Sequence, residues 1–181
     1  MKPPESSQSP QGNKATVPRW AAIILALFVG LIGIPLAHGG VPWVISMWMP
    51  RHGWENGVPG FWNWLGLIPV AIAAALLLWI LASAIPQAPA RVRLGLTPSL
   101  LLTRGPYRLS RNPLYVAELG LWLGWAFFFG SIGVLIGFAV LLSVVCFVLV
   151  PREERTLEAV FGQSYLDYKT KVPRWFGGRK K

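Results

Sequence analysis

Residues 114–150 read LYVAELGLWLGWAFFFGSIGVLIGFAVLLSVVCFVLV, and this stretch decides the fold class. Its only ionisable side chains are Tyr115, Glu118 and Cys146. A helix rises about 1.5 Å per residue, and the hydrocarbon core of a bilayer is about 30 Å thick. The stretch is therefore long enough to cross a membrane twice, and the pair Gly130-Ser131 predicts a tight turn between helices over 114–129 and 132–150.

The composition of the whole chain also indicates a membrane protein. Of its 181 residues, 54% are hydrophobic and 13% are charged, whereas soluble domains carry about 25% charged residues. Two further apolar runs cover residues 20–36 and 61–85. We therefore expect an all-α integral membrane protein with four transmembrane helices and short interfacial helices near the C-terminus.

The chain divides into four predicted regions. Residues 1–17 are rich in Pro, Ser and Gln and should form a disordered leader. Residues 18–90 form a two-helix membrane region, in which Pro35 should mark the end of the first helix and 38–60 a connector. The first run resembles a cleaved signal peptide, but the further spans favour an uncleaved helix. Residues 91–176 carry the polar motifs, and 177–181 form a basic tail.

The net charge of +10 has a clear distribution along the chain. Residues 1–19 contain three Lys and Arg, residues 86–112 contain five, and the chain after residue 150 contains eight. In a protein with four spans these three segments lie on one side of the membrane, and Arg51 alone lies on the other side. The positive-inside rule then places both termini in the cytoplasm of a multi-pass inner or plasma membrane protein. Contact with anionic membrane lipid explains the charge, and no nucleic-acid partner is expected. His38 and His52 have no nearby Cys and one nearby Glu, so no metal site is expected.

Two polar segments flank the apolar stretch. The basic strip 103–115, TRGPYRLSRNPLY, leads into it, and the pair Glu153-Glu154 follows it. In one interpretation, Glu153 and Glu154 only stabilise the N-terminus of a helix through its dipole, and Arg152 and Arg155 are their solvated partners. Alternatively, the carboxylates and the strip's guanidinium groups face each other at one membrane surface and bind a ligand that carries an ammonium and a carboxylate. Both interpretations stay open on these residues.

Three residues in or near the strip, Tyr107, Tyr115 and Glu118, have two interpretations each. An acid such as Glu118 inside a membrane helix costs about 2.5–3.5 kcal/mol at mid-span, so it either reaches the interface or belongs to a site. Tyr107 and Tyr115 are either interfacial anchors or parts of that site. The pair Asn112-Pro113 predicts the N-cap and first position of the third helix.

An ordered set of motifs resembles a known family. The set comprises Gly105-Pro106-Tyr107-Arg108, then 111–115 (RNPLY), the two-helix hairpin, Glu153-Glu154, and 161–175 from FGQSY to VPRW. Together, over roughly residues 90–176, it resembles the isoprenylcysteine carboxyl methyltransferase family, whose wider group includes the phospholipid N-methyltransferases. The resemblance implies a membrane enzyme with a core at 91–176. Such an enzyme transfers a methyl group from S-adenosylmethionine to a lipidic or small amphipathic acceptor.

The resemblance also implies roles for individual residues. Arg111 and Glu154 become the candidate catalytic residues, with Arg111 meeting an anionic group of cofactor or substrate. Either Glu153 or Glu154 would meet the cationic or hydroxyl groups of the cofactor. The full set implied to line the cofactor pocket is Gly105, Pro106, Tyr107, Arg108, Asn112, Pro113, Tyr115, Glu118 and Glu153.

The chain departs from the family pattern at several positions. Asn112 stands where relatives often carry His, Ser99 where some carry another His, and Ala117 where Gly is usual. With no His in the matched half, a histidine base there is excluded, and transfer to a carboxylate, thiolate or tertiary amine would depend on alignment and desolvation. Two alternatives remain: a membrane reductase of the sterol-reductase type that uses NADPH, and a scaffold without activity.

Overall fold

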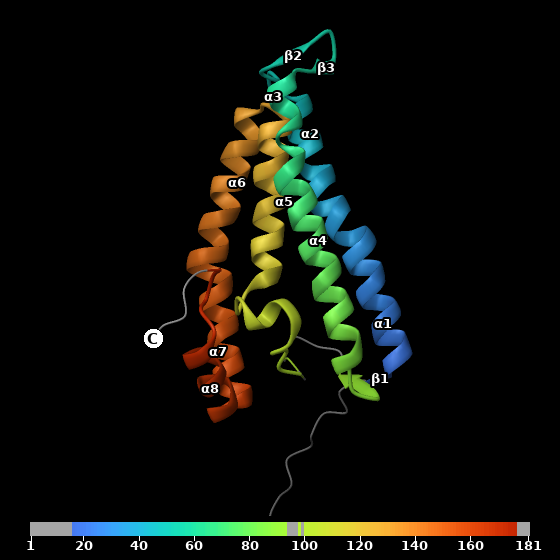
Figure 1. The fold of residues 1–181 in the computed structure, drawn as a ribbon, viewed down its shortest axis with the longest axis vertical. Coiled ribbons are helices and arrows are strands. Elements are labelled where there is room, and N and C mark those ends of the chain that lie inside the picture. Colours follow the sequence, from blue (N-terminus) through green and yellow to red (C-terminus); the bar gives the residue numbers. More distant parts are fainter. Residues whose placement is uncertain (1–15, 94–97, 99, 177–181) are drawn as a thin grey trace, which may run out of the picture.

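The computed structural model describes residues 16–93, 98 and 100–176. The predicted tail 177–181, Ser99 and nearly all of the predicted leader therefore lie outside the described residues. The described chain is mostly helical, and its long helices lie alongside one another in an elongated bundle (Figure 1). Three helices are long and apolar enough to cross a membrane, over 19–47, 61–87 and 132–161, and α5 (Pro113–Phe129) is apolar but shorter.

The first helix is longer than the sequence predicted. It runs without a break through α1 (Arg19–Phe28), two π-helical turns, η1 (Val29–Gly33) and η2 (Leu36–Gly40), and α2 (Val41–Met47). The predicted end near Pro35 is wrong, because the π-helical turns on either side accommodate the hydrogen bond that proline cannot make. As a result, His38 lies within the helix and not in a connector.

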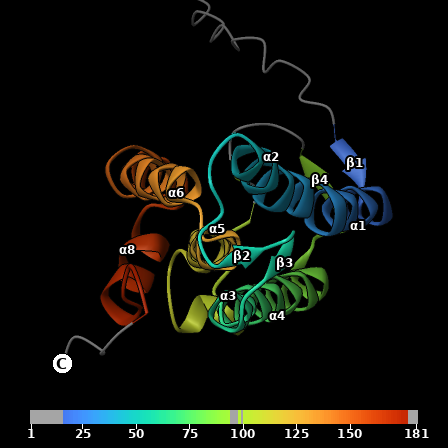
Figure 2. The ribbon, with the colours of Figure 1, turned by 90° about the horizontal axis from the view of Figure 1, so that it is seen from above.

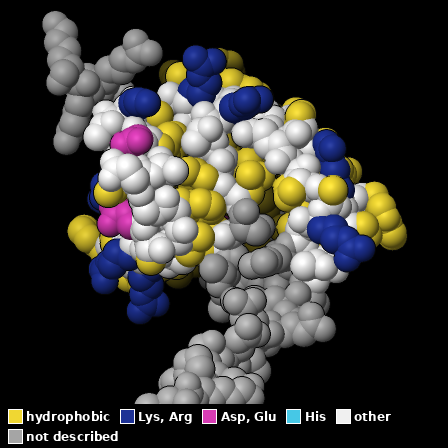
Figure 3. Space-filling view, turned by 90° about the horizontal axis from the view of Figure 1, so that it is seen from below, with side chains coloured by type: hydrophobic (Ala, Val, Ile, Leu, Met, Phe, Trp, Pro, Cys, Tyr) yellow, Lys and Arg dark blue, Asp and Glu magenta, His cyan; other side chains and the backbone are white. Residues whose placement is uncertain are grey.

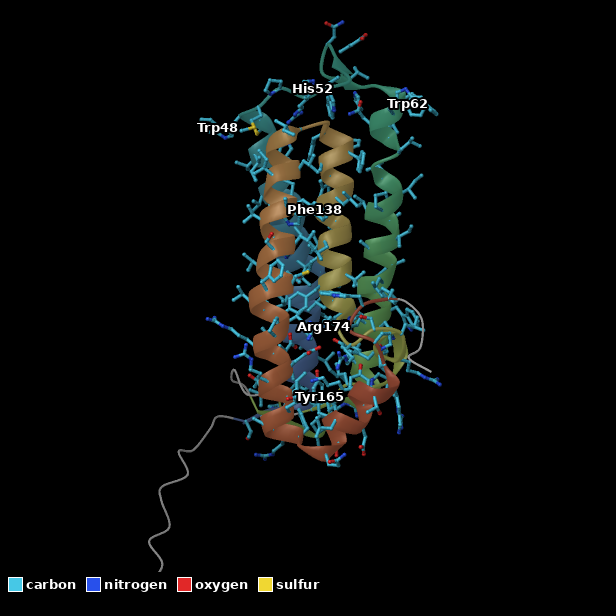
Figure 4. All side chains as sticks on the ribbon, turned by 90° about the vertical axis from the view of Figure 1, so that its left-hand side faces the viewer. Trp48, His52, Trp62, Phe138, Tyr165 and Arg174 are labelled. Carbon is cyan, nitrogen blue, oxygen red and sulfur yellow. The ribbon has the colours of Figure 1, made fainter. Side chains whose placement is uncertain are left out.

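The connector after α2 closes one end of the bundle. It contains a hairpin of β2 (Trp54–Glu55) and β3 (Val58–Pro59), followed by α3 (Phe61–Trp64). The Asn63 amide nitrogen donates to the carbonyls of His52 (3.1 Å) and Phe128 (3.0 Å), which ties the connector to the end of α5. Trp48 and Trp62 lie exposed at this end (Figure 4), as expected for an interfacial aromatic belt.

Helix α5 is the centre of the bundle. Seen from above, it is surrounded by α2, α4 (Leu67–Ala84) and α6 (Ile132–Val144) (Figure 2). Small residues let α5 approach α4 closely: a Cβ at Gly124 would lie 2.7 Å from the Gly66 carbonyl oxygen and 2.6 Å from Val70. The helix begins at Pro113 with Asn112 as N-cap and ends at Gly130 in the left-handed conformation, as predicted for its start and turn.

The fourth predicted helix does not end at Val150. It continues from α6 through a π-helical turn, η5 (Val145–Leu149), into α7 (Val150–Phe161). The π-helical turn ends at Leu149, two residues before Pro151, whose ring nitrogen has no hydrogen bond to donate. Only α8 (Gln163–Lys171), which follows Gly162 at a positive φ of 52°, is a separate short C-terminal helix.

The opposite end of the bundle carries shorter elements. Here β1 (Thr16–Pro18) pairs antiparallel with β4 (Arg91–Arg93), next to the 3₁₀ turn η3 (Ile85–Gln87) at the end of α4. A second 3₁₀ turn, η4 (Gly105–Arg108), leads toward α5. The two short sheets are a departure from the predicted all-α fold. Both lie next to helix ends, where backbone N–H and C=O groups need hydrogen-bond partners.

Candidate functional site

The predicted site residues gather at the end of the bundle that carries η4, α7 and α8. Viewed from below, this face has Lys and Arg side chains around its rim and apolar side chains between them (Figure 3). Three residues of the predicted set have packing roles here. Gly105 has φ +63°, and a Cβ there would lie 2.5 Å from the Ser83 side chain on α4, while Pro106 and Pro113 are buried.

Glu154 lies between two guanidinium groups. The residue is 5% exposed, with Arg111 Nη2 at 3.2 Å from Oε1 and Arg174 Nη2 at 2.7 Å from Oε2. The hydrogen bond from Arg174 to Glu154 raises the pKa of the Arg174 guanidinium above its ordinary value. Arg111 keeps two buried donors, Nε and Nη1, that no described residue accepts. The two predicted catalytic residues, Arg111 and Glu154, therefore contact each other.

The backbone of Pro173 and Arg174, here called the C-terminal latch, fastens onto the turn before α5. The Arg174 carbonyl accepts hydrogen bonds from Ser110 Oγ (2.9 Å) and the Asn112 amide nitrogen (3.1 Å). The Arg111 N–H donates to the Pro173 carbonyl at 2.9 Å. The latch thus fixes the backbone at Arg111, and Figure 4 shows Arg174 and Tyr165 together toward this end.

Glu153 points away from this ion-pair cluster, since consecutive helical side chains diverge by about 100°. Its Oε2 accepts a hydrogen bond of 3.0 Å from the Tyr115 hydroxyl. Burial and the charge of Glu153 raise the pKa of Tyr107 to about 12, so that hydroxyl remains protonated. The Tyr168 hydroxyl in turn donates to the Tyr107 carbonyl at 2.6 Å and holds η4 against α8.

Glu118 lies one helical turn beyond Tyr115 on the same face of α5. The His38 ring lies beside it, with Nε2 at 3.8 Å from Glu118 Oε1. The other ring nitrogen, Nδ1, accepts a hydrogen bond of 3.1 Å from Trp122 Nε1. Sequence reasoning missed His38 because it ended the first helix at 36; the apolar residues of 41–47 were the signal that the helix continues.

Among the described residues, Arg108 forms no ion pair with Glu118, Glu153 or Glu154. It is exposed and lines a cavity of about 620 Å³ beside α8, together with Thr103, Ser164, Asp167, Lys171 and their neighbours. No group of three or more His, Cys, Asp or Glu suited to a metal ion occurs in the described part of the chain.

A comparison with protein families tests the resemblance seen in the motifs. The model of the phospholipid methyltransferase family matches residues 61–164, more than half of the chain. The chain belongs to the phospholipid methyltransferase family. This membership confirms the resemblance seen in the motifs, because the family is part of the group that also holds the isoprenylcysteine carboxyl methyltransferases.

The match spans α4, the strip from Gly105 to Tyr115, the α5–α6 hairpin and the pair Glu153-Glu154. Together with the long apolar helices, it identifies a member of a membrane methyltransferase family. His38 and Arg174 lie outside the matched residues. A search of curated proteins found no match.

Proposed function

We propose that the protein is an integral membrane methyltransferase that uses S-adenosylmethionine and acts on a lipidic or amphipathic acceptor. The observation that supports this most is the different surroundings of two adjacent carboxylates. Glu154 is buried and neutralised by two Arg side chains, whereas Glu153 is exposed and bonded to the neutral Tyr115 hydroxyl. Glu153 therefore keeps a negative charge available for a cationic ligand.

The residues present fit the cofactor. S-adenosylmethionine supplies, when bound, a methyl group on a positively charged sulfur, and it also carries an ammonium and a carboxylate. Glu153, with the hydroxyl groups of Tyr115 and Tyr107 near it, would hold a cationic part. The unpartnered Nε and Nη1 of Arg111 would donate to a carboxylate, which gives these buried groups the acceptors that they lack.

The contacts favour distinct roles for the two predicted catalytic residues. Arg111 binds an anionic group with its free donors, and Glu154 positions Arg111 through the ion pair at 3.2 Å. Four of the other predicted pocket residues would form the wall: Gly105 and Pro106 belong to η4, Asn112 to the turn that the C-terminal latch holds, and Pro113 to the start of α5. Alignment of the reactants by this wall supplies several kcal/mol toward the reaction.

The proposed topology has four membrane crossings, with α5 as the fourth beside the three longer helices. Sixteen of the seventeen Lys and Arg then lie on the side of the site, which the positive-inside rule assigns to the cytoplasm together with both termini. Because the site lies at the ends of membrane helices, a lipidic acceptor reaches it from the bilayer. The region 91–176 is the methyltransferase core in this proposal, and 18–90 supports it.

A binding experiment tests the proposal. Purified protein in detergent is incubated separately with labelled S-adenosylmethionine and with NADPH. Binding of S-adenosylmethionine alone is expected; binding of NADPH alone would support a reductase, and binding of neither would support an inactive scaffold. Glu153→Gln should weaken cofactor binding by about tenfold, the value of one charge-assisted hydrogen bond. Glu158→Gln, on the same helix but paired with Lys169, is the matched control and should bind normally.

A further inference from the structure

The cavity beside α8 is separate from the proposed cofactor site. It has a volume of about 620 Å³, which is within the range of about 300–1,000 Å³ that ligand pockets have. Its described lining residues are Thr103, Arg108 and Leu109 before α5, and Ser164, Asp167, Tyr168, Lys171, Val172 and Pro173 in and after α8. Arg111, Glu153 and Glu154 are not among these residues, so the proposed methyl transfer leaves the cavity without a role.

The cavity has two cations, Arg108 and Lys171, that come from different elements. Arg108 is the last residue of η4, and Lys171 is the last residue of α8. Both are exposed, and neither forms an ion pair with an acid in the described part of the chain. Lys169 on the same helix, in contrast, is paired with Glu158. Two cations that share a cavity without acidic partners attract an anion to it.

The charge of the cavity fits a phosphodiester. Asp167 is the one acid among the described lining residues, and its Oδ1 accepts a hydrogen bond of 2.7 Å from Gln163. Two cations and one carboxylate give the lining a net charge of +1. A phosphodiester carries one negative charge, whereas a phosphate monoester carries about 1.5–2 at neutral pH. Arginine also binds phosphate oxygens with two parallel hydrogen bonds.

In the proposed topology the cavity lies at the level of the lipid headgroups. The helix over 132–161 has 30 residues and is about 45 Å long, against about 30 Å of hydrocarbon. Its charged part begins at Arg152, directly after the apolar run. Figure 4 shows Arg174 nearer to the middle of the bundle than Tyr165, so the chain after α8 returns toward the membrane. This returning segment lines the cavity.

The wall of the cavity also carries apolar surface. Leu109 is 48% exposed, and Val172 and Pro173 belong to the same lining. The glycerol and acyl parts of a lipid lose contact with water against such surface, whereas inorganic phosphate gains nothing from it. Basic side chains surround apolar ones on this face of the molecule (Figure 3), which also suits a lipid headgroup.

We propose that this cavity binds one anionic phospholipid, with its phosphodiester between Arg108 and Lys171. The lipid is a bound ligand and not the methyl acceptor. It bridges η4 and α8, which the hydrogen bond from the Tyr168 hydroxyl to the Tyr107 carbonyl already joins. Pro173 in the cavity wall accepts the hydrogen bond of the Arg111 N–H. Bound lipid therefore stabilises the C-terminal latch and, through it, the position of Arg111.

The first test is binding of labelled phosphatidylglycerol to the full chain in an uncharged detergent. Binding should saturate at about one molecule per chain. Arg108→Gln and Lys171→Gln should each weaken it about tenfold, through the loss of one charge-assisted hydrogen bond. Arg152→Gln and Arg155→Gln are the matched controls, because they remove exposed cations of α7 that do not line the cavity, and both should bind as native. Equal weakening in the two pairs would overturn the site in favour of general attraction to charge.

Competition identifies the part of the ligand that is recognised. Unlabelled phosphatidylglycerol should displace the label, and equal concentrations of inorganic phosphate, glycerol 3-phosphate or phosphatidylcholine should not. Displacement by either free phosphate compound would assign the cavity to a soluble ligand. Displacement by phosphatidylcholine would remove the need for an anionic headgroup. Either result contradicts the proposal.

A third measurement follows the link from the cavity to Arg111. Phosphatidylglycerol should raise the unfolding temperature of the native protein clearly more than that of Lys171→Gln. It should also lower the Kd of the native protein for S-adenosylmethionine about fivefold. Lys171→Gln should bind S-adenosylmethionine as the native protein does without lipid, and should gain nothing when lipid is added. A native protein that binds S-adenosylmethionine with no gain from lipid would overturn the link.

The lipid site and the proposed function can fail separately. Selective binding of phosphatidylglycerol by a protein that binds no S-adenosylmethionine would refute the proposed function and support the lipid site. Binding of S-adenosylmethionine without saturable binding of phosphatidylglycerol would refute the lipid site alone.

Discussion

The Asn112 side chain donates a hydrogen bond to the Arg174 carbonyl, 3.1 Å away, although Asn112 occupies the N-cap position of α5. An N-cap Asn ordinarily accepts a hydrogen bond from the first turn of its own helix. Here no such side-chain cap bond is made. The Asn112 side-chain amide nitrogen holds the C-terminal latch instead.

Glu154 should be essential for stability. Glu154→Gln removes the only described anion that faces the buried Arg111, which already has two unpartnered nitrogens. Breaking a buried pair from one side costs about 3 kcal/mol or more. Thermal unfolding in detergent should therefore shift strongly downward. Glu158→Gln, whose pair with Lys169 is more than one third exposed, should shift it by less than about 1 kcal/mol, and equal shifts would contradict the assignment.

The two buried tyrosines of α8 should respond in opposite ways to loss of the hydroxyl. Tyr168→Phe removes the 2.6 Å hydrogen bond to the Tyr107 carbonyl and should cost about 1 kcal/mol of unfolding free energy. Tyr165 is 1% exposed and its hydroxyl has no described partner, so Tyr165→Phe should leave stability unchanged or raise it. Chemical denaturation of the two variants side by side measures the difference, and a larger loss in Tyr165→Phe would show a missing partner.

The same end of the molecule should lose stability at alkaline pH. Burial raises the pKa of both Tyr107 and Tyr165 to about 12, with the nearby glutamates adding to the shift. Between pH 10 and 12 the unfolded chain ionises these tyrosines while the folded chain does not, so the unfolded state binds fewer protons and stability falls as the pH rises. The contribution is fully present below pH 10.

Unfolding midpoints between pH 8 and 12 check this expectation. Tyr107→Phe and Tyr165→Phe should each flatten the decline above pH 10. A decline of the same steepness in the double variant would assign it to other groups.

The contact of α4 with α5 depends on glycine. A Cβ at Gly124 would approach the Gly66 carbonyl oxygen and the Val70 side chain too closely, so Gly124→Ala must push the helices apart and should cost about 1–3 kcal/mol. Gly40→Ala is the matched control, because a Cβ there meets nothing within 4 Å. Replacement of a helical glycine by alanine at that position should be neutral or stabilising by up to about 1 kcal/mol.

Helix ends were predicted correctly from the sequence where the residues that end the helix act within a single turn. Asn112-Pro113 and Gly130 gave the bounds of α5 correctly, because caps and left-handed turns are local. The helix ends predicted at residues 36 and 150 are wrong, because π-helical turns next to Pro35 and shortly before Pro151 let each helix continue. In an apolar helix that neighbours support, a proline does not have to end the helix.

For the site, the motifs predicted that Glu153 and Glu154 both belong to it, but they did not predict which partner each carboxylate would contact. Their divergence on α7 sends one to Tyr115 and the other to Arg111 and Arg174, and only the register of α7 against α5 decides which. The contact of His38 with Trp122 joins residues 84 positions apart. Such a contact follows from how α5 packs against the first helix, which no local pattern encodes.

The C-terminal latch has a consequence for how the protein is made. Pro173 and Arg174 follow every described membrane helix in the chain, so the helices leave the ribosome and can enter the bilayer before the latch exists. Until those two residues emerge, the turn at Ser110–Asn112 has no carbonyl partners to hold it. The order of synthesis therefore separates insertion from maturation: a nascent chain can be fully embedded while its site is still unassembled.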